Sequence, residues 1–108
     1  MAFDFSDVVL IPFPYRDKAG EKARPAVVLS GKSYNASGDV VVAAITSHRA
    51  RFATDYELVD WKSAGLILPS TIRMLLATIA TSRVLHRAGR LTPIDWTEVH
   101  LRIGRVFS

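Results

Sequence analysis

Arg24 and Thr46 are the residues of this chain whose types and positions best suit chemistry. Arg24 precedes the apolar run Pro25–Ser30, and Thr46 ends the apolar run that begins at Val40. Short apolar runs bounded by turn residues predict buried strands. If the two strands are neighbours, the guanidinium of Arg24 and the hydroxyl of Thr46 meet in one groove. The guanidinium is always charged and has several N–H donors, and the hydroxyl can rotate, so together they can bind a phosphodiester. Alternatively, Arg24 is a solvated edge residue before a proline, and Thr46 reflects ordinary strand propensity.

His48 follows Thr46 by two residues and is a candidate for proton transfer. Histidine is the residue type that ordinarily titrates near neutral pH. Alternation along a strand puts positions 46 and 48 on one face only if the strand continues past Ser47. The competing interpretation is an exposed loop histidine. No His, Asp or Glu residues stand at the spacing of metal ligands, so we predict no metal site and no cofactor.

Basic and aromatic residues flank the two predicted strands. Cationic side chains follow a phosphate backbone and aromatic rings stack on bases, so these residues are candidates for binding single-stranded nucleic acid. A solvated, charged loop is the alternative. The candidates are Tyr15, Arg16, Lys18, Lys22, Arg49, Arg51, Phe52 and Arg73.

Length and composition indicate one folded domain over residues 1–108. Of the residues, 49% are hydrophobic and 22% are charged, which is enough apolar content for a packed core. The chain has no cysteine, so a disulfide framework and a thiolate zinc site are excluded. No signal peptide and no apolar run long enough for a membrane span is evident, and we expect a cytoplasmic protein.

The charge balance favours an anionic partner. The formal net charge is +4, and ten of the fourteen basic residues are arginine, the better residue for bidentate phosphate contacts. Such a balance is typical of nucleic-acid binding, but an acidic protein partner explains it equally well.

The apolar pattern predicts a strand-rich, closed sheet followed by one helix. We expect strands at 7–12, 25–30 and 40–46, an outer strand at 56–59, and a bent strand pair at 69–81. Turns are expected at 31–38 and 60–65.

The helix has a clear beginning at Thr92, a good N-cap, followed by Pro93. Its apolar positions 96, 99, 103 and 106 form one face. Ile94 and Leu101 point away from that face, which hints at a second packing surface such as a dimer contact.

Several sequence blocks resemble the MazF/PemK family of toxins from type II toxin-antitoxin systems. The most specific block is Arg24–Ser30, and the similarity covers about residues 6–107. The other blocks are Ser6–Tyr15, Ile45–Ser47, Asp60-Trp61, Ala64–Leu66, Pro69-Ser70, Arg73 and Gly89–Leu91.

The resemblance implies a mainly β fold, an SH3-like barrel of the MazF/CcdB type with a C-terminal helix. It also implies a homodimer that cleaves single-stranded RNA without a metal, and an antitoxin protein that blocks the RNA groove. The family's catalytic arginine falls on Arg24 and its catalytic threonine on Thr46. The chain departs from the family at Ser6, where glycine is usual, and at Ala23, where some members carry histidine.

Three classes of function follow from these observations. The first is a sequence-selective endoribonuclease toxin, in which attack by the 2′-OH leaves a 2′,3′-cyclic phosphate. The second is a CcdB-like toxin that poisons gyrase through protein binding, and the third is a non-catalytic SH3-like binding module. The pairing of Arg24 with Thr46 favours the first.

Overall fold

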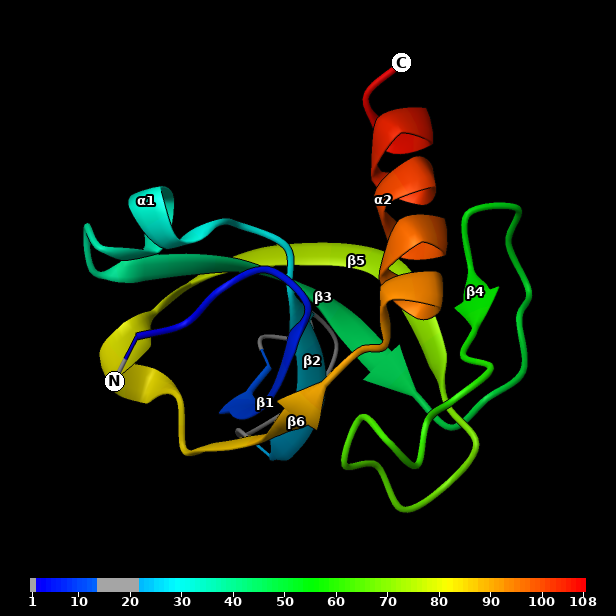
Figure 1. Cartoon of the computed structure of the whole chain (residues 1–108), viewed down its shortest axis with the longest axis horizontal. Helices are drawn as coiled ribbons and strands as arrows, with labels where there is room; N and C mark the ends of the chain where they lie inside the picture. The colour runs from blue at the N-terminus through cyan, green and yellow to red at the C-terminus, as the bar shows by residue number, and fades with distance from the viewer. Residues whose placement is uncertain (1, 14–21) are drawn as a thin grey trace.

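The computed structural model describes residues 2–13 and 22–108. Strands make up most of its regular structure, with one long helix at the end of the chain (Figure 1). The elements are β1 (Asp7–Pro12), β2 (Ala23–Val28), α1 (Lys32–Asn35), β3 (Asp39–Thr46), β4 (Tyr56–Glu57), β5 (Thr71–Ala80), the 3₁₀ turn η1 (Thr81–Arg83), β6 (His86–Arg90) and α2 (Pro93–Val106).

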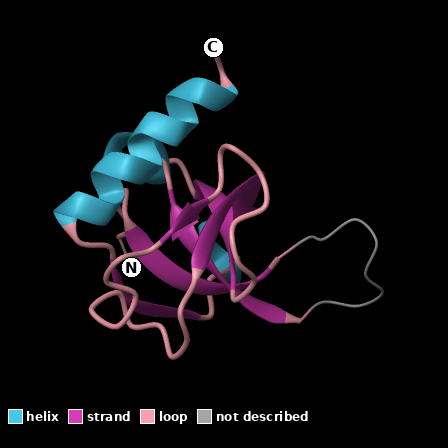
Figure 2. Ribbon diagram, turned by 90° about the vertical axis from the view of Figure 1, so that its right-hand side faces the viewer, coloured by secondary structure: helices cyan, strands magenta, loops and turns pink. Residues whose placement is uncertain are grey.

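The six strands form one antiparallel sheet in the order β4-β5-β3-β2-β1-β6. The sheet curls around its concave side as a half-barrel, and α2 lies across one side of it (Figures 1 and 2). This arrangement confirms the expected mainly β fold with a C-terminal helix. Among residues 2–13 and 22–108, β4 and β6 are edge strands. The expectation of a closed sheet was therefore wrong in this respect: the sheet curls but does not close through strand pairing in the part of the chain that the structure describes.

The central strands are apolar on both faces because a separate cluster of buried hydrophobic residues packs against each face. Val9 and Val28 belong to a cluster on one face, whereas their neighbours Val8 and Val27 belong to a cluster on the other. The second cluster includes Val99, which brings α2 onto the sheet. Burial on both faces explains why these strands are almost continuous apolar runs in the sequence.

The segment after β4 packs backbone against backbone on the edge strand β6. A Cβ added at Gly65 would lie 2.2 Å from the carbonyl oxygen of Ala88, and one added at Gly89 would lie 2.5 Å from that of Ala64. Gly65 also has a φ of +84°, which favours glycine. These two glycines therefore allow the chain to cover the open edge of the sheet and fix the loop that follows Gly65.

The observed elements differ from the expected ones in several places. The outer strand expected at 56–59 comprises only Tyr56–Glu57. β2 begins at Ala23, because Ala23 and Arg24 pair with the end of β1. The expected strand pair is a single strand, β5, and its bend coincides with a register shift opposite Ala43 and Ala44. β6 was not expected, since its sequence has no apolar alternation. The region expected as a turn contains α1.

The helix α2 begins as predicted. The Thr92 side chain accepts a hydrogen bond from the backbone N–H of Asp95, and Pro93 follows the cap. Ile94 and Leu101 are exposed, as expected for residues away from the packed face.

Ser6 explains one departure from the family pattern. Its φ is +70°, in the left-handed region that glycine adopts without steric cost. A glycine, which the resemblance leads us to expect at this position, would therefore adopt the same backbone geometry.

Candidate functional site

A row of polar residues crosses one end of the sheet. Thr46 on β3 pairs with Thr71 on β5, and Thr71 pairs with Glu57 on β4. On the other side, β2 pairs with β3 as far as Ala26 opposite Ala44. Continuing that register by two residues brings Arg24 to the level of Thr46, and both residues line one pocket. Directly opposed residues share a face of the sheet. The order of strands thus places Arg24, Thr46, Thr71 and Glu57 side by side on one face.

Arg24, Thr46 and His48 line one pocket of about 270 Å³, hereafter the Arg24 pocket. The exposed apolar side chains of Ile67 and Leu68 form part of its wall. The remaining lining residues are Pro25, Ile45, Ser47, Leu66 and Ser70. The structure therefore brings together the three residues that the sequence proposed for chemistry, beside an apolar surface.

The Thr46 hydroxyl is oriented by the turn that follows β3. The backbone N–H of His48 donates to Thr46 Oγ1 at 3.2 Å. β3 ends at Thr46, so His48 reaches the pocket through this turn and the strand does not continue. Because the oxygen already accepts this bond, the hydroxyl hydrogen is directed elsewhere and can be donated to a ligand.

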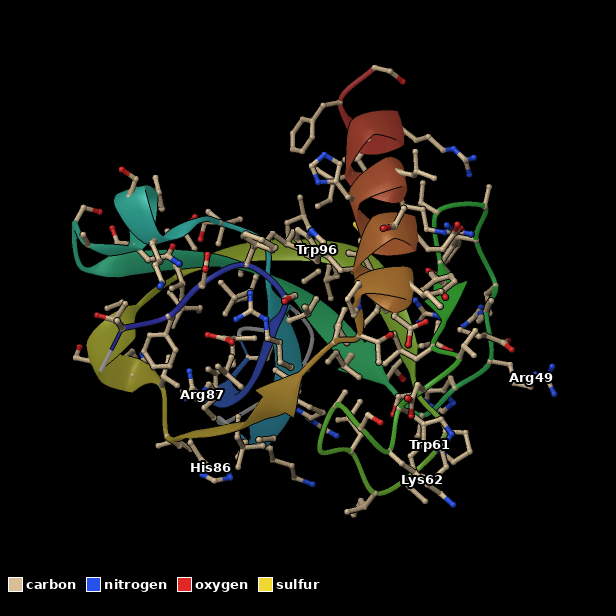
Figure 3. The ribbon with its side chains drawn as sticks, viewed as in Figure 1. Arg49, Trp61, Lys62, His86, Arg87 and Trp96 are labelled. Carbon is tan, nitrogen blue, oxygen red and sulfur yellow. The ribbon has the colours of Figure 1, made fainter. Side chains whose placement is uncertain are left out.

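A second pocket, of about 190 Å³, adjoins the first; we call it the Trp61 pocket. It shares Ser47, His48 and Ser70 with the Arg24 pocket. Its other lining residues are Arg49, Glu57, Leu58, Trp61, Pro69 and Thr71. In Figure 3, Arg49, Trp61 and Lys62 lie at one end of the molecule, well away from His86 and Arg87.

Glu57 is charged at neutral pH and already has partners on one oxygen. Its Oε2 accepts from the Ala50 backbone N–H at 2.9 Å and from Arg49 Nε at 3.4 Å. The Ala50 hydrogen bond is the main cause that lowers the pKa of Glu57 below its usual value. The Arg49 side chain is 90% exposed, so its remaining donors face solvent.

Arg73 has a different environment from Arg24. Arg73 Nη2 lies 3.0 Å from Asp55 Oδ2, and its Nε lies 3.4 Å from Oδ1. The Asp55 side chain is fully buried and also accepts from the N–H groups of Arg51 and Phe52. Burial alone would raise the pKa of Asp55, but these hydrogen bonds hold it below its usual value. Asp55 therefore stays ionised and fixes the loop before β4.

The RNA-binding candidates separate into groups. Phe52 is exposed, and the guanidinium groups of Arg51 and Arg73 lie 5.7 and 5.3 Å from its ring centre. Arg49 lines the Trp61 pocket, whereas these three residues line neither pocket. Lys22 is exposed, two residues before Arg24. Tyr15, Arg16 and Lys18 lie outside the described residues, and RNA contacts for the whole set stay predictions.

Asp95 joins α2 to the segment that carries the Trp61 pocket. Its side chain is buried and accepts from the Tyr56 hydroxyl at 2.5 Å and from the N–H groups of Asp60 and Val59 at 2.9 and 3.1 Å. Burial, followed by the bond to Asp95, raises the pKa of Tyr56, so the hydroxyl remains a donor. Asp95 thereby positions residues 56–60 beside the sheet.

Sequence reasoning missed Glu57, Thr71, Ile67 and Leu68 as site residues. Ile67 and Leu68 carried no signal of their own, because exposed apolar residues are common on protein surfaces. Nothing in the local sequence marks Glu57 or Thr71 as a site residue, because they lie near Thr46 only through the order of the strands in the sheet.

Among residues 2–13 and 22–108, no group of three or more His, Asp or Glu side chains is placed to hold a metal ion. Within the same ranges, no helix is long and apolar enough to cross a membrane.

Comparisons with solved structures show the same fold at low sequence identity. An endoribonuclease in complex with its cognate antitoxin from a Mycobacterial species matches with a TM-score of 0.79 and 16% identity, over 98% of this chain and 95% of the other. A MazE-MazF structure from Deinococcus radiodurans gives 0.77 and 18% over 100% and 97%. The Mycobacterium tuberculosis toxin MazF-mt6 gives 0.75 and 24% over 94% and 95%.

No curated protein sequence matches the chain significantly. The family model of PemK-like, MazF-like toxins of type II toxin-antitoxin systems, however, matches residues 4–107, almost the whole chain. The chain therefore belongs to the PemK/MazF family of toxins.

Proposed function

We propose that this toxin is an endoribonuclease that cleaves single-stranded RNA without a metal ion. The observation that carries the proposal is that Arg24 and Thr46 line one open pocket, with His48 beside them. Family membership supports it, as do solved structures of the same fold that are described as endoribonucleases. Its action would be cytoplasmic, where the RNA substrate is found.

The reaction uses the nucleophile that RNA carries. The 2′-oxygen attacks the adjacent phosphorus and loses its proton, while the bond from phosphorus to the 5′-oxygen breaks. The leaving oxygen gains a proton, so the products are a 2′,3′-cyclic phosphate and a 5′-hydroxyl. Negative charge builds on the non-bridging oxygens during attack, and fixed donors at that point are usually the largest catalytic contribution.

Arg24 and Thr46 suit that stabilising role. The guanidinium is always charged and presents several donors in one plane, which matches two phosphate oxygens. Thr46 supplies its hydroxyl hydrogen to a phosphate oxygen, because its oxygen is held by the His48 N–H. Arginine hardly deprotonates, so His48 is our candidate for proton transfer.

A cleavage assay with product analysis tests this proposal. A long single-stranded RNA is incubated with the purified protein, with and without EDTA, and the ends of the products are identified by mass spectrometry. We expect equal cleavage in both samples, cyclic phosphate ends, and no cutting of DNA with the same sequence. Loss of cleavage in EDTA, or 3′-hydroxyl products, would contradict the mechanism.

We further propose that the toxin works as a homodimer controlled by an acidic antitoxin. The exposed Ile94 and Leu101 offer an apolar contact surface, and the net charge of +4 attracts acidic side chains as well as phosphates. Solved structures of this fold include a complex with a cognate antitoxin.

Sedimentation at micromolar concentration should give twice the 11.9 kDa chain mass. RNA and the antitoxin should compete for the protein. A monomer that still cuts RNA would rule out a groove shared between subunits, and simultaneous binding of both ligands would rule out direct blockade.

A further inference from the structure

We propose that the Trp61 pocket is a nucleobase subsite that selects the base beside the cut. Glu57 would read the base and Trp61 would stack on it. The inference rests on the proposed function, because it takes single-stranded RNA as the ligand of the adjoining Arg24 pocket. It adds a source of sequence selectivity to that function.

The distance between the two pockets fits neighbouring nucleotides. Thr46, Thr71 and Glu57 are consecutive members of one row across β3, β5 and β4. Adjacent strands are about 4.8 Å apart, so Glu57 stands roughly 10 Å from Thr46. A phosphate held at Thr46 therefore places a base of an adjacent nucleotide within reach of the Trp61 pocket. The pockets share the lining residues Ser47, His48 and Ser70, so they lie directly next to each other.

The chemistry of Glu57 determines which bases fit. An ionised carboxylate only accepts hydrogen bonds. Oε2 is occupied by Ala50 and Arg49, whereas Oε1 has no hydrogen-bond partner within the described part of the chain. A base with an exocyclic amino group can donate to Oε1, as cytosine does to glutamate in nucleic-acid complexes. Uracil lacks this group and presents carbonyl oxygens beside its single N–H, so we infer that the subsite disfavours uracil.

Trp61 supplies a contact that does not depend on base identity. Its ring is half-buried against the core behind the pocket, and Lys62 Nζ lies 5.4 Å from the ring centre. Every base has a flat face that can stack on an aromatic ring. Glu57 and Trp61 therefore have separable effects: Glu57 sets the preference among bases, and Trp61 sets the strength of binding to all of them.

Sequencing the cleavage products of a randomised single-stranded RNA pool tests the proposal. For the wild type, we expect uracil to be depleted at one position next to the cut. Glu57→Gln replaces the acceptor-only group by an amide and should change the ratio of uracil to amino-bearing bases there by about tenfold. Trp61→Ala should slow cleavage of all sequences and keep the preference.

Glu98→Gln is the matched control. Glu98 also pairs with an arginine, Arg102, at 2.9 Å, but it lies on α2 and lines neither pocket. The base preference of the Glu98→Gln variant should equal that of the wild type. An unchanged preference in folded Glu57→Gln protein, as judged by circular dichroism, would overturn the subsite.

A binding selection separates this inference from the cleavage reaction. The same pool is selected for binding to Thr46→Ala protein and to the Thr46→Ala/Glu57→Gln double variant. A base preference that depends on Glu57 supports the subsite, whether or not the wild type cuts RNA. Absence of cleavage by the wild type would refute only the proposed function. Identical bound pools from the two variants would overturn the subsite even if cleavage is confirmed.

Discussion

Arg24 and Arg73 lie in neighbouring rows of one sheet face but have different surroundings. Arg24 is in the row of Thr46, and Arg73 pairs with Ala44, two residues away along β3. Arg73 is held by the buried carboxylate of Asp55, whereas Arg24 lines an open pocket beside Thr46. Two arginines in adjacent rows of one face therefore differ in what they contact, and of the two it is Arg24 that lines the pocket in which we propose RNA cleavage.

The largest effect on stability should come from breaking the Arg73–Asp55 pair. Asp55→Asn leaves the guanidinium beside a neutral amide in a largely buried site. Removing one partner of such a pair lowers the free energy of unfolding by about 3 kcal/mol. Urea unfolding measures this loss, and Arg73→Met should give a loss of similar size. A change near zero in both variants would show that the pair does not hold the loop before β4.

The pH dependence of stability sharpens the same comparison. The pKa of Asp55 is lower in the folded protein than in the unfolded chain, where it is about 4. Ionised Asp55 therefore adds to the free energy of unfolding above pH 4, and this stabilisation is lost as the pH falls through the pKa of the folded state. The stability difference between wild type and Asp55→Asn should therefore shrink as the pH falls below about 4. A constant difference from neutral pH down to acid unfolding would contradict an ionised Asp55.

Asp95 should give a smaller loss. Asp95→Asn replaces one of the oxygens that accept from Tyr56, Val59 and Asp60 by an amide that donates. Leaving a buried donor without an acceptor lowers the free energy of unfolding by about 2 kcal/mol. Tyr56→Phe removes one donor only and should lower it by about 1 kcal/mol. Equal losses in the two variants would argue against Asp95 as the centre of this contact.

Arg49 should have the smallest effect on folding and a measurable one on binding. Its side chain is 90% exposed, so Arg49→Ala should leave the unfolding midpoint unchanged. If Arg49 contacts a phosphate, the slope of log affinity for single-stranded RNA against log salt should become less negative by about 0.7. Fluorescence anisotropy over a salt series measures the slope, and an unchanged slope would remove Arg49 from the RNA surface.

Local sequence signals predicted much of the fold. The apolar runs at β1 and β3 and the Thr92 cap of α2 are encoded by neighbouring residues, and they appear where expected. β6 could not be predicted in this way, because its pairing partner β1 is far away in the sequence. The single strand β5 was divided in the prediction, since a bulge opposite Ala43 interrupts its pattern.

The candidate site was predictable only where each residue carried its own signal. Arg24, Thr46 and His48 were identified from residue type and position, and the structure places them in one pocket. The sequence also suggested Arg73 for RNA binding, which stays a prediction, but it could not show that Asp55, eighteen residues earlier, pairs with that side chain. Glu57 was missed for the same reason, because strand order alone brings it to the row of Thr46.

Single-turnover RNA cleavage by Arg24→Ala and Thr46→Ala tests the central claim most directly. Each variant removes a donor that the account directs at the developing phosphate charge, and such a loss typically slows the reaction by about 10²–10³-fold. We expect each rate to fall by at least about 100-fold, with circular dichroism and the unfolding midpoint unchanged. Wild-type cleavage rates in both folded variants would contradict the assignment of the Arg24 pocket as the site of RNA cleavage.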